Sequence, residues 1–430
     1  MTRQSVTTDS EMTFAEKMFA KATGKNVVQA GDIVYPDPEL IIIHDAYLEA
    51  AYRELQKLGY KRVTRPERLM AVTDHEVVYA TQKSLERGRA NRRIVRDWRV
   101  GRFFDAGQGG HGHIFPMEMG IVRPGMFIAA YDMHCSNFGA VGAYALATGP
   151  DITVMLATGT MWVEVPETIF VELKGNLAPG VHARDVGFSL SRHLSEGRSG
   201  FTAEARVVEF HGNNLDRMSV ATRAGIINTL TETDVAHVLF PPMTYDGMPV
   251  SALSHLPSRS HAKFAGTLSF DLDSLTPQLA LPGAPSNAAE VSVAAGTTIH
   301  HAYIGACGSS QYEDFANAAA VMKDRHVAAG VRLLIVPGTV AIAQRMMHDG
   351  LTQKFMDAGA IILPPGCGPC AGGLMGQVGS NEVSISTAAT NGPGRMGAKD
   401  AEYFLGSPLT VAASAVTGRI TDPRELLCSS

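Results

Sequence analysis

The sequence predicts an α/β fold made of several subdomains. Short apolar runs alternate with helix-like segments along the chain, which is the pattern of sheets covered by helices. The 430 residues exceed what one ordinary hydrophobic core can hold, so two or three packed subdomains are expected. The hydrophobic content of 45% and the charged content of 18% are typical of a well-buried globular enzyme and exclude a disordered or fibrous chain.

Three apolar strands are each followed by acidic and histidine side chains. The predicted strands are 40–43 before His44-Asp45, 69–73 before Asp74-His75, and 125–131 before Asp132-Met133-His134. Open α/β sheets place their sites at the carboxyl ends of the strands, where such residues converge. We therefore expect the two acidic–histidine pairs and the Asp-x-His segment to contribute to one site.

The remaining elements follow from local patterns. Basic residues between Lys83 and Arg99 alternate with Leu85, Ile94 and Val95, which predicts a helix with a solvated basic face. Residues 161–173 have a strand-like pattern, and residues 207–234 contain a further α/β unit. The expected later elements, in order, are a Pro-, Ala- and Ser-rich connection between lobes at 276–287, a strand at 333–336, a helix at 340–358 and a strand at 361–363.

These patterns divide the chain into three parts. Residues 1–11 are expected to be a flexible tail, residues 12–285 an N-terminal α/β lobe of two subdomains, and residues 286–430 a C-terminal lobe that carries the cysteine loops. The net charge of −5, without long charged runs, argues against nucleic-acid and membrane binding. A chain with five cysteines, no twenty-residue apolar run and no signal-peptide core is expected in the reducing cytoplasm.

Three cysteines are the strongest chemical signal. Cys367 and Cys370 form a C-x-x-C in a loop rich in Pro and Gly, and Cys307 lies far upstream. Three thiolates can hold three corners of an iron–sulfur cube and leave the fourth iron open to a substrate. A structural zinc site would need a fourth Cys or His at short spacing, and a redox dithiol should open a helix. From spacing alone, a cluster, a zinc site and redox or inert thiols all remain open.

Several blocks of the sequence are similar to one family. They are residues 72–75 (VTDH), 103–107 (FFDAG), 132–135 (DMHC), 165–169 (VPETI), 365–370 (PGCGPC), 394–397 (GRMG) and 412–418 (AASAVTG). With these blocks the chain resembles the aconitase superfamily, in particular the large subunit of 3-isopropylmalate dehydratase, from about Met12 to Pro423. The resemblance implies an aconitase-like iron–sulfur domain built from several three-layer α/β/α subdomains around a central cluster, without the swivel domain.

The resemblance also implies a cofactor, a reaction and a partner. Cys307, Cys367 and Cys370 would bind a [4Fe–4S] cluster whose unligated iron coordinates a substrate hydroxyl and carboxylate. Members of the family dehydrate a hydroxy diacid and usually rehydrate the alkene. Hydroxide is a poor leaving group until it is metal-bound or protonated. Because the family's swivelling domain is missing, a small subunit of the 3-isopropylmalate dehydratase type is expected as the partner.

The matching positions supply the expected site residues. Five are assigned to catalysis by the resemblance: Asp74, His75, Asp132, His134 and Glu232. Four are assigned to substrate binding: Arg395, Asn228, Asn137 and His44. A carboxylate behind an imidazole fixes its tautomer and raises its basicity, so the pairs make chemical sense. A further histidine of the family aligns cleanly with neither His111 nor His113, and one of the two is expected to replace it.

The sequence departs from the family pattern at three places. Met133 replaces a serine, Gly308-Ser309 replaces Thr-Asn after Cys307, and of two family arginines near residue 390 only Arg395 is present. Arginine is suited to bidentate carboxylate binding, so the substrate is expected to be a substituted malate or maleate other than 3-isopropylmalate. The alternatives are a maleate- or dimethylmaleate-type hydratase that does not isomerise, and a non-catalytic iron- or oxygen-sensing RNA-binding relative.

Overall fold

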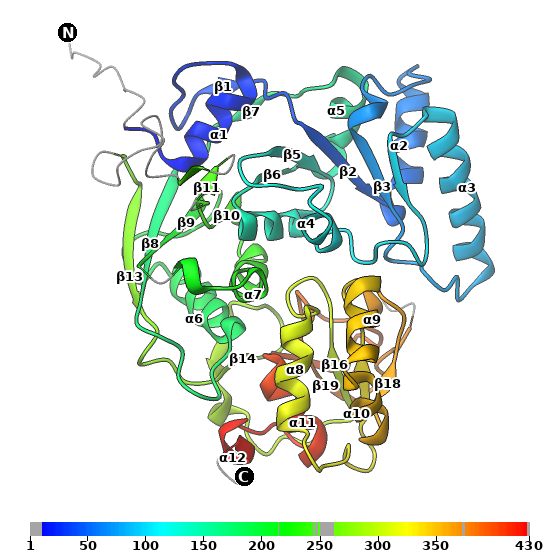
Figure 1. Ribbon diagram of the computed structural model, residues 1–430, viewed down its shortest axis with the longest axis vertical. Coiled ribbons are helices and arrows are strands. Elements are labelled where there is room, and N and C mark those ends of the chain that lie inside the picture. Colours follow the sequence, from blue (N-terminus) through cyan, green and yellow to red (C-terminus); the bar gives the residue numbers. More distant parts are fainter. Residues whose placement is uncertain are drawn as a thin grey trace.

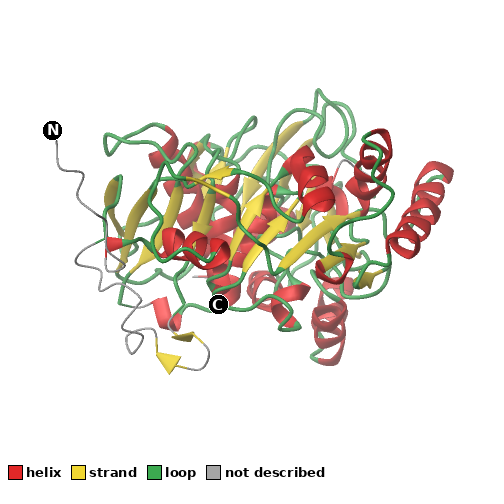
Figure 2. Ribbon diagram, turned by 90° about the horizontal axis from the view of Figure 1, so that it is seen from above, coloured by secondary structure: helices red, strands yellow, loops and turns green. Residues whose placement is uncertain are grey.

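The structure is a computed structural model (Figure 1) and describes residues 11–213, 215–242, 244–245, 248–249, 262–371 and 375–427. Three sheets of four or more strands organise the described residues. Figure 2 shows strands running through the middle of the molecule with helices around them. The α/β prediction is therefore confirmed. The tail predicted for residues 1–11 lies outside the described residues except for Glu11.

The first sheet has five parallel strands in the order β4-β3-β2-β5-β6. They are β2 (Leu40–His44), β3 (Leu69–Val72), β4 (Arg102–Phe104), β5 (Phe127–Ala130) and β6 (Tyr144–Ala147). One face packs on α2 (Asp45–Lys57), α3 (Gln82–Trp98) and α5 (Ile152–Thr158), the other on α4 (Phe115–Glu118) and the 3-10 helix η3 (Met133–Val141). Because β3, β2 and β5 are neighbours, the polar residues that follow them lie at one edge.

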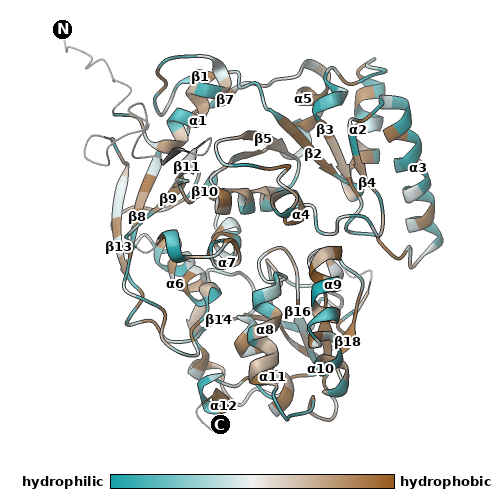
Figure 3. Cartoon of the chain, viewed as in Figure 1, coloured by the Kyte–Doolittle hydropathy of each residue, from teal (hydrophilic) through white to brown (hydrophobic). Residues whose placement is uncertain are grey.

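The basic stretch forms the predicted helix, α3, at the rim of the first sheet. The hydroxyl of Thr81 caps it by accepting the N–H of Ser84 at 3.1 Å. Ile94 and Trp98 are buried against the sheet, and Figure 3 shows a largely hydrophilic surface along the rest of the helix. None of the described helices combines the length and the apolar character of a membrane span.

The second sheet has four parallel strands in the order β10-β9-β8-β13. They are β8 (Thr168–Lys174), β9 (Val207–His211), β10 (His237–Leu239) and β13 (Gly266–Asp271). α6 (Ala183–Ser195) and α7 (Val220–Thr231) cover one face, and α1 (Phe14–Thr23) packs on the other. Two short antiparallel pairs complete this region: β1 (Ile33–Val34) with β7 (Val163–Glu164), and β11 (Thr244–Tyr245) with β12 (Met248–Pro249).

The third sheet has seven strands in the order β15-β14-β20-β19-β16-β17-β18. They are β14 (Gln278–Ala280), β15 (Ala288–Glu290), β16 (His301–Ile304), β17 (Arg332–Ile335), β18 (Ile361–Ile362), β19 (Val383–Ser386) and β20 (Glu402–Gly406). One face packs on α8 (Tyr312–Val321), α9 (Val340–His348), α10 (Leu351–Asp357) and α11 (Pro408–Thr417), and α12 (Arg424–Leu427) ends the described chain. The other face packs on Phe188 of α6 and includes the three cysteines.

The structure corrects two local predictions. Residues 276–287 are more than a connection, because they contain β14, which pairs with β15 and β20. The third sheet therefore begins before residue 286, the predicted lobe boundary. The helix predicted for 340–358 is divided into α9 and α10 at Gly350, whose φ of +74° is a left-handed conformation that favours glycine.

Candidate active site

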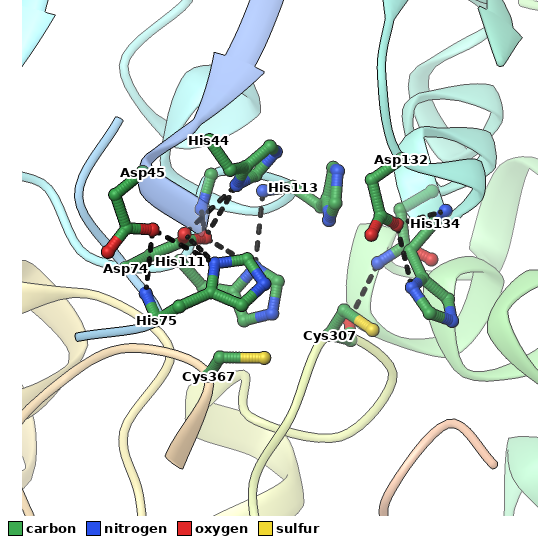
Figure 4. Close-up of polar contacts among 12 residues, drawn as sticks. His44, Asp45, Asp74, His75, His111, His113, Asp132, His134, Cys307 and Cys367 are labelled. Carbon is green, nitrogen blue, oxygen red and sulfur yellow. Dashed lines mark hydrogen bonds and ion pairs between the residues drawn. The ribbon is translucent and has the colours of Figure 1, made fainter. Parts of the chain in front are cut away.

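The edge of the first sheet meets the cysteine loops of the third sheet at one cavity. Figure 4 shows the residues at the ends of β2 and β3 on one side and Asp132 and His134 on the other, with Cys367 and Cys307 below them. The cavity has a volume of about 140 Å³. It is lined by Ala46, Tyr47, His75, His111, His113, Asp132, His134, Cys367, Cys370 and Arg395.

The three cysteines are buried, unbridged and held by polar neighbours. Cys307 follows β16 in a turn that places Ala306 at a φ of +61°. The Nδ2 of Asn228 donates to the Cys307 sulfur at 3.0 Å, and the Nδ2 of Asn137 donates to the Cys307 carbonyl at 2.7 Å. Both asparagines therefore contact the first cysteine.

The cysteine loop after β18 is joined to the first sheet through the backbone. The N–H of Cys367 donates to the carbonyl oxygen of Asp74 at 2.8 Å. Gly366, with a φ of +151°, lets this approach occur, because a Cβ there would lie 2.7 Å from the same oxygen. A hydrogen bond between the two loop thiols raises the pKa of Cys367 and lowers that of Cys370.

The arrangement of the sulfurs fits a multinuclear cluster better than a single ion. Tetrahedral zinc with Zn–S bonds of about 2.3 Å brings its sulfur ligands to about 3.8 Å from one another. The three sulfurs do not all lie within 4.8 Å of one another, since within the described residues only His44, Asp74 and His75 form such a group. In an iron–sulfur cluster each cysteine binds a different iron, which permits the wider spacing. The three thiols therefore fit the group that the sequence predicts.

Asp74 joins two imidazoles at the end of β3. Its carboxylate oxygens lie 2.9 and 3.0 Å from the Nδ1 of His44, and Oδ1 lies 2.7 Å from the Nδ1 of His75. Oδ2 also accepts the N–H of Gly112 at 2.8 Å. Burial would raise the pKa of Asp74, but the facing imidazoles hold it well below its usual value. Asp74 is therefore an ionised carboxylate in the interior.

His75 is held by two carboxylates at one nitrogen. The Oδ1 of Asp45 lies 3.1 Å from its Nδ1, beside Asp74. Burial alone would lower the pKa of His75, but Asp74 and Asp45 together raise it well above the ordinary value. The described structure provides no hydrogen-bond partner for Nε2, and the ring lines the cavity. His75 can therefore carry a proton into the cavity.

His134 is bound at both of its ring nitrogens. Nδ1 lies 2.8 Å from the Oδ1 of Asp132, and Nε2 lies 2.8 Å from the Oε1 of Glu232. Burial would lower the pKa of His134, but Cys307 and the two carboxylates raise it well above its usual value. The sequence-predicted group of Asp132, His134 and Glu232 is therefore assembled, with a charged and immobile ring.

His111 and His113 both line the cavity, so the structure does not select one of them over the other. The two rings are 5.4 Å apart, and His113 lies 4.4 Å from the ring of His44. Burial lowers the pKa of His111 to about 4 and holds the pKa of His113 well below its usual value. Both are neutral imidazoles at physiological pH.

Two residues that the sequence did not predict belong to this site. Tyr47 lines the cavity, stacks on Tyr131 at 3.9 Å and donates its hydroxyl to the Oδ2 of Asp132 at 3.2 Å. Arg184 of α6 is wholly buried, and its Nη1 donates to the Oδ1 of Asn228 at 3.4 Å. The one available signal for Tyr47 was its position two residues after the predicted His44-Asp45 pair. Nothing local distinguishes Arg184.

Arg395 supplies the fixed positive charge that lines the cavity. Burial would lower its pKa, but the Cys370 and Cys367 sulfurs raise it, so the guanidinium remains charged. Its Nε has no hydrogen-bond partner in the described structure. An arginine in this position can bind the carboxylate of a ligand.

A larger cavity lies elsewhere, between α8 and α10, and has a volume of about 670 Å³. Apolar side chains such as Leu351 and Phe355 form much of its lining, and no predicted site residue contributes to it. The smaller cavity is the better candidate, because charged imidazoles, a guanidinium and thiols converge there.

The sequence profile of the aconitase family (aconitate hydratase) matches residues 16–297 and 292–418. Among curated proteins, the 3-isopropylmalate dehydratase large subunit 1 of Methanopyrus kandleri is 35% identical over 427 residues, which are 96% of this chain and 99% of that protein. The large subunit 1 from Pyrococcus furiosus is 34% identical, with 97% of this chain and 99% of that protein covered. Among solved structures, holo aconitase X of Thermococcus kodakaraensis aligns with a TM-score of 0.49 and 12% identity, covering 88% and 89% of the two chains.

Proposed function

This chain belongs to the aconitase family and is a hydro-lyase, and on that premise we propose its reaction, cofactor and partner. It is the large, catalytic subunit of a [4Fe–4S] enzyme that dehydrates and rehydrates a substituted malate. One observation carries the proposal: Cys367, Cys370 and two carboxylate-held imidazoles line a single cavity, and the third buried cysteine, Cys307, lies next to it.

Cys307, Cys367 and Cys370 would hold the cluster. Membership of the family implies an iron–sulfur group, and three cysteines leave one iron of a [4Fe–4S] cluster without a protein sulfur. When bound, such a cluster supplies a Lewis acid for a substrate hydroxyl. The asparagines that contact Cys307 orient this ligand by hydrogen bonds to its sulfur and its carbonyl oxygen.

His75 is the proposed acid. Its Nδ1 is held by Asp74 and Asp45, so the proton on Nε2 is the one that can reach a ligand in the cavity. Protonation of the departing hydroxyl converts hydroxide, a poor leaving group, into water. His44, on the far side of Asp74, holds the carboxylate in position at 2.9 Å.

Arg395 and the charged imidazoles select an anionic substrate. Arg395, His75 and His134 present positive charge to a small cavity, which suits the carboxylates of a hydroxy diacid. A carboxylate that is neutralised by a cation also makes the neighbouring C–H more acidic. Asp132, His134 and Glu232 form the second, fixed side of the site.

The proposed partner is a small swivel-domain subunit. The relatives are named as large subunits, and this chain covers 99% of the length of several of them. A partner would supply further substrate contacts at the interface, including a base and a second arginine. We place the enzyme in the cytoplasm, because the described cysteines are free thiols and none of them forms a disulfide.

A hydratase that does not isomerise is the second candidate. Arg395 is the single arginine among the residues that line the cavity of the described structure, and Thr390 stands where the family has another. Fewer cations suit a smaller or less anionic substrate, such as a maleate-type diacid. Thr390→Arg should improve the use of a bulkier or more anionic substrate if this explanation of the specificity is correct.

The proposal is tested by co-expression with a candidate small subunit and anaerobic reconstitution. Iron and sulfide are counted, and a panel of substituted malates and maleates is followed by the absorbance of the alkene. Cys307→Ser should abolish turnover, whereas Cys135→Ser, at a buried thiol that donates to the carbonyl of Ala145, should keep the cluster. Full turnover after iron has been removed, or equal loss in both variants, would contradict the assignment.

A further inference from the structure

Arg184 is a wholly buried guanidinium behind the cysteines. It is 0% exposed, and its Nη2 donates to the carbonyl oxygen of Ala388 at 2.8 Å. Nη1 makes the long contact with Asn228, and Nε has no partner in the described structure. A buried charge is unfavourable unless an opposite charge compensates it. Arg184 therefore requires a negative charge nearby.

The carboxylates near Arg184 are engaged elsewhere. Asp185 accepts two backbone N–H groups, and Asp314 lies 3.2 Å from the Nε2 of His182. Among the described carboxylates, none lies within ion-pair distance of Arg184. Burial lowers the pKa of Arg184 to about 10, and the Cys307 sulfur opposes this lowering more than either carboxylate does. Because both carboxylates are engaged, the side that remains for a compensating charge is that of the cysteine sulfurs.

A hydrogen-bond chain connects Arg184 to that sulfur. The guanidinium donates to the Oδ1 of Asn228, and the Nδ2 of the same amide donates to the sulfur of Cys307. Gly308 makes the close packing possible: a Cβ on residue 308 would lie 2.3 Å from the Asn228 oxygen and 2.6 Å from the Nη1 of Arg184. This series of hydrogen bonds therefore depends on a glycine at position 308, directly after Cys307.

We propose that Arg184 is a positioning residue for the iron–sulfur group, which compensates the charge of the thiolate-bound cluster and orients Asn228 towards Cys307. This inference rests on the cofactor of the proposed function. Thiolate ligands make the bound cluster negative, and an added electron makes it more so. A fixed cation and hydrogen bonds to the sulfurs therefore favour the reduced form and raise the reduction potential.

The test measures this potential on the large subunit alone, reconstituted under anaerobic conditions. The cluster is titrated with dithionite, which donates one electron per cluster, and the reduced form is followed by electron paramagnetic resonance. Arg184→Met, which keeps much of the volume and removes the charge, should shift the equilibrium towards the oxidised form at least tenfold, or about 59 mV downwards for one electron. Arg184→Lys should keep the potential near that of the unaltered protein.

Arg345→Gln is the matched control, because Arg345 lies on the surface helix α9 of the cluster-bearing lobe and pairs with Asp349. It should leave the potential unchanged. An unaltered potential in Arg184→Met, or an equal shift in Arg345→Gln, would overturn the proposal. Arg184→Met could fold but lose its iron. In that case, retention of iron by Arg184→Lys would support the proposed role of the positive charge, whereas loss of iron in both variants would overturn the proposal.

Thermal unfolding of the iron-free protein separates this role from ordinary packing. Without a cluster, the buried cation of Arg184 lacks its partner, so Arg184→Met should unfold at or above the temperature of the unaltered protein. A lower unfolding temperature of the iron-free variant with an unchanged potential would show a structural role alone. Neither the potential nor the unfolding temperature requires a substrate. If the protein showed the expected shift in potential but no hydro-lyase activity, that result would contradict the proposed reaction and leave the role of Arg184 standing. Absence of iron from the unaltered protein would overturn both.

Discussion

The two histidine–carboxylate groups of the cavity differ in which nitrogen atoms are engaged. His75 shares one nitrogen between Asp74 and Asp45, at 2.7 and 3.1 Å, and its other nitrogen is directed away from both carboxylates. His134 has a carboxylate 2.8 Å from each nitrogen. Two charged imidazoles of similar burial are therefore suited to different tasks: one can release a proton to a ligand, and the other cannot do so without breaking an ion pair.

Replacement of His75 tests the comparison with the largest expected effect. His75→Gln removes the only proton donor that this group can offer to the cavity. We expect kcat to fall by about 10² to 10⁴, the usual contribution of a general acid. Iron content, measured in the same preparation, should not change. A variant that keeps its kcat would show that the proton comes from elsewhere, for instance from His134.

Replacement of Glu232 should have a smaller effect. Glu232→Gln keeps the shape of the side chain but removes the charge 2.8 Å from the Nε2 of His134. Loss of a carboxylate behind a functional imidazole typically costs 10- to 100-fold, and we expect about that loss in kcat/KM. If Glu232→Gln lowered kcat/KM as much as His75→Gln, the proposed difference between a proton that His75 can release and one that His134 retains would be wrong.

The hydroxyl of Tyr47 should contribute still less. Tyr47→Phe keeps the ring stacked on Tyr131 and removes the hydrogen bond to the Oδ2 of Asp132. A hydrogen bond to a charged group is worth about 1.5 kcal/mol or somewhat more, so kcat/KM should fall about tenfold. Tyr131→Phe, which alters the other ring of the stack, is the control and should have little effect on steady-state kinetics.

The smallest effect is expected for Asp45→Asn, and it appears in the pH profile. Asp74 and Asp45 raise the pKa of His75, against the lowering effect of burial. Removing the charge of Asp45 lowers this pKa, so the protonated acid is lost at a lower pH than before. The alkaline limb of the kcat/KM profile should therefore move to lower pH, with little change where His75 is still protonated. An alkaline limb that stays in place would indicate titration of a different group.

The sequence predicted the elements whose signal is local. Strands β2, β3 and β5 are unbroken apolar runs with polar ends, and their positions in the sheet follow from parallel pairing. β14 was not predicted, because a strand of three residues in a Pro- and Ala-rich segment is too short to show an alternating apolar pattern. The division between α9 and α10 depends on the left-handed conformation of Gly350, which the apolar pattern on either side conceals.

The same distinction applies to the site. Motif residues such as His75, Cys367 and Cys370 could be expected at one site from strand ends and resemblance, and these three line the cavity. Tyr47 and Arg184 could not, because each acts through a partner distant in sequence: Asp132 for the tyrosine, Asn228 for the arginine. An arginine followed by an aspartate at a helix start is typical of an exposed position, and only tertiary packing buries this one.

The contact between the N–H of Cys367 and the carbonyl oxygen of Asp74 has a mechanical consequence. This backbone hydrogen bond joins the loop that contains Cys367 to the segment after β3 that contains His75. A displacement of either is transmitted to the other within a single peptide unit. A change in the cysteine loop is therefore expected to move the backbone beside His75 as well.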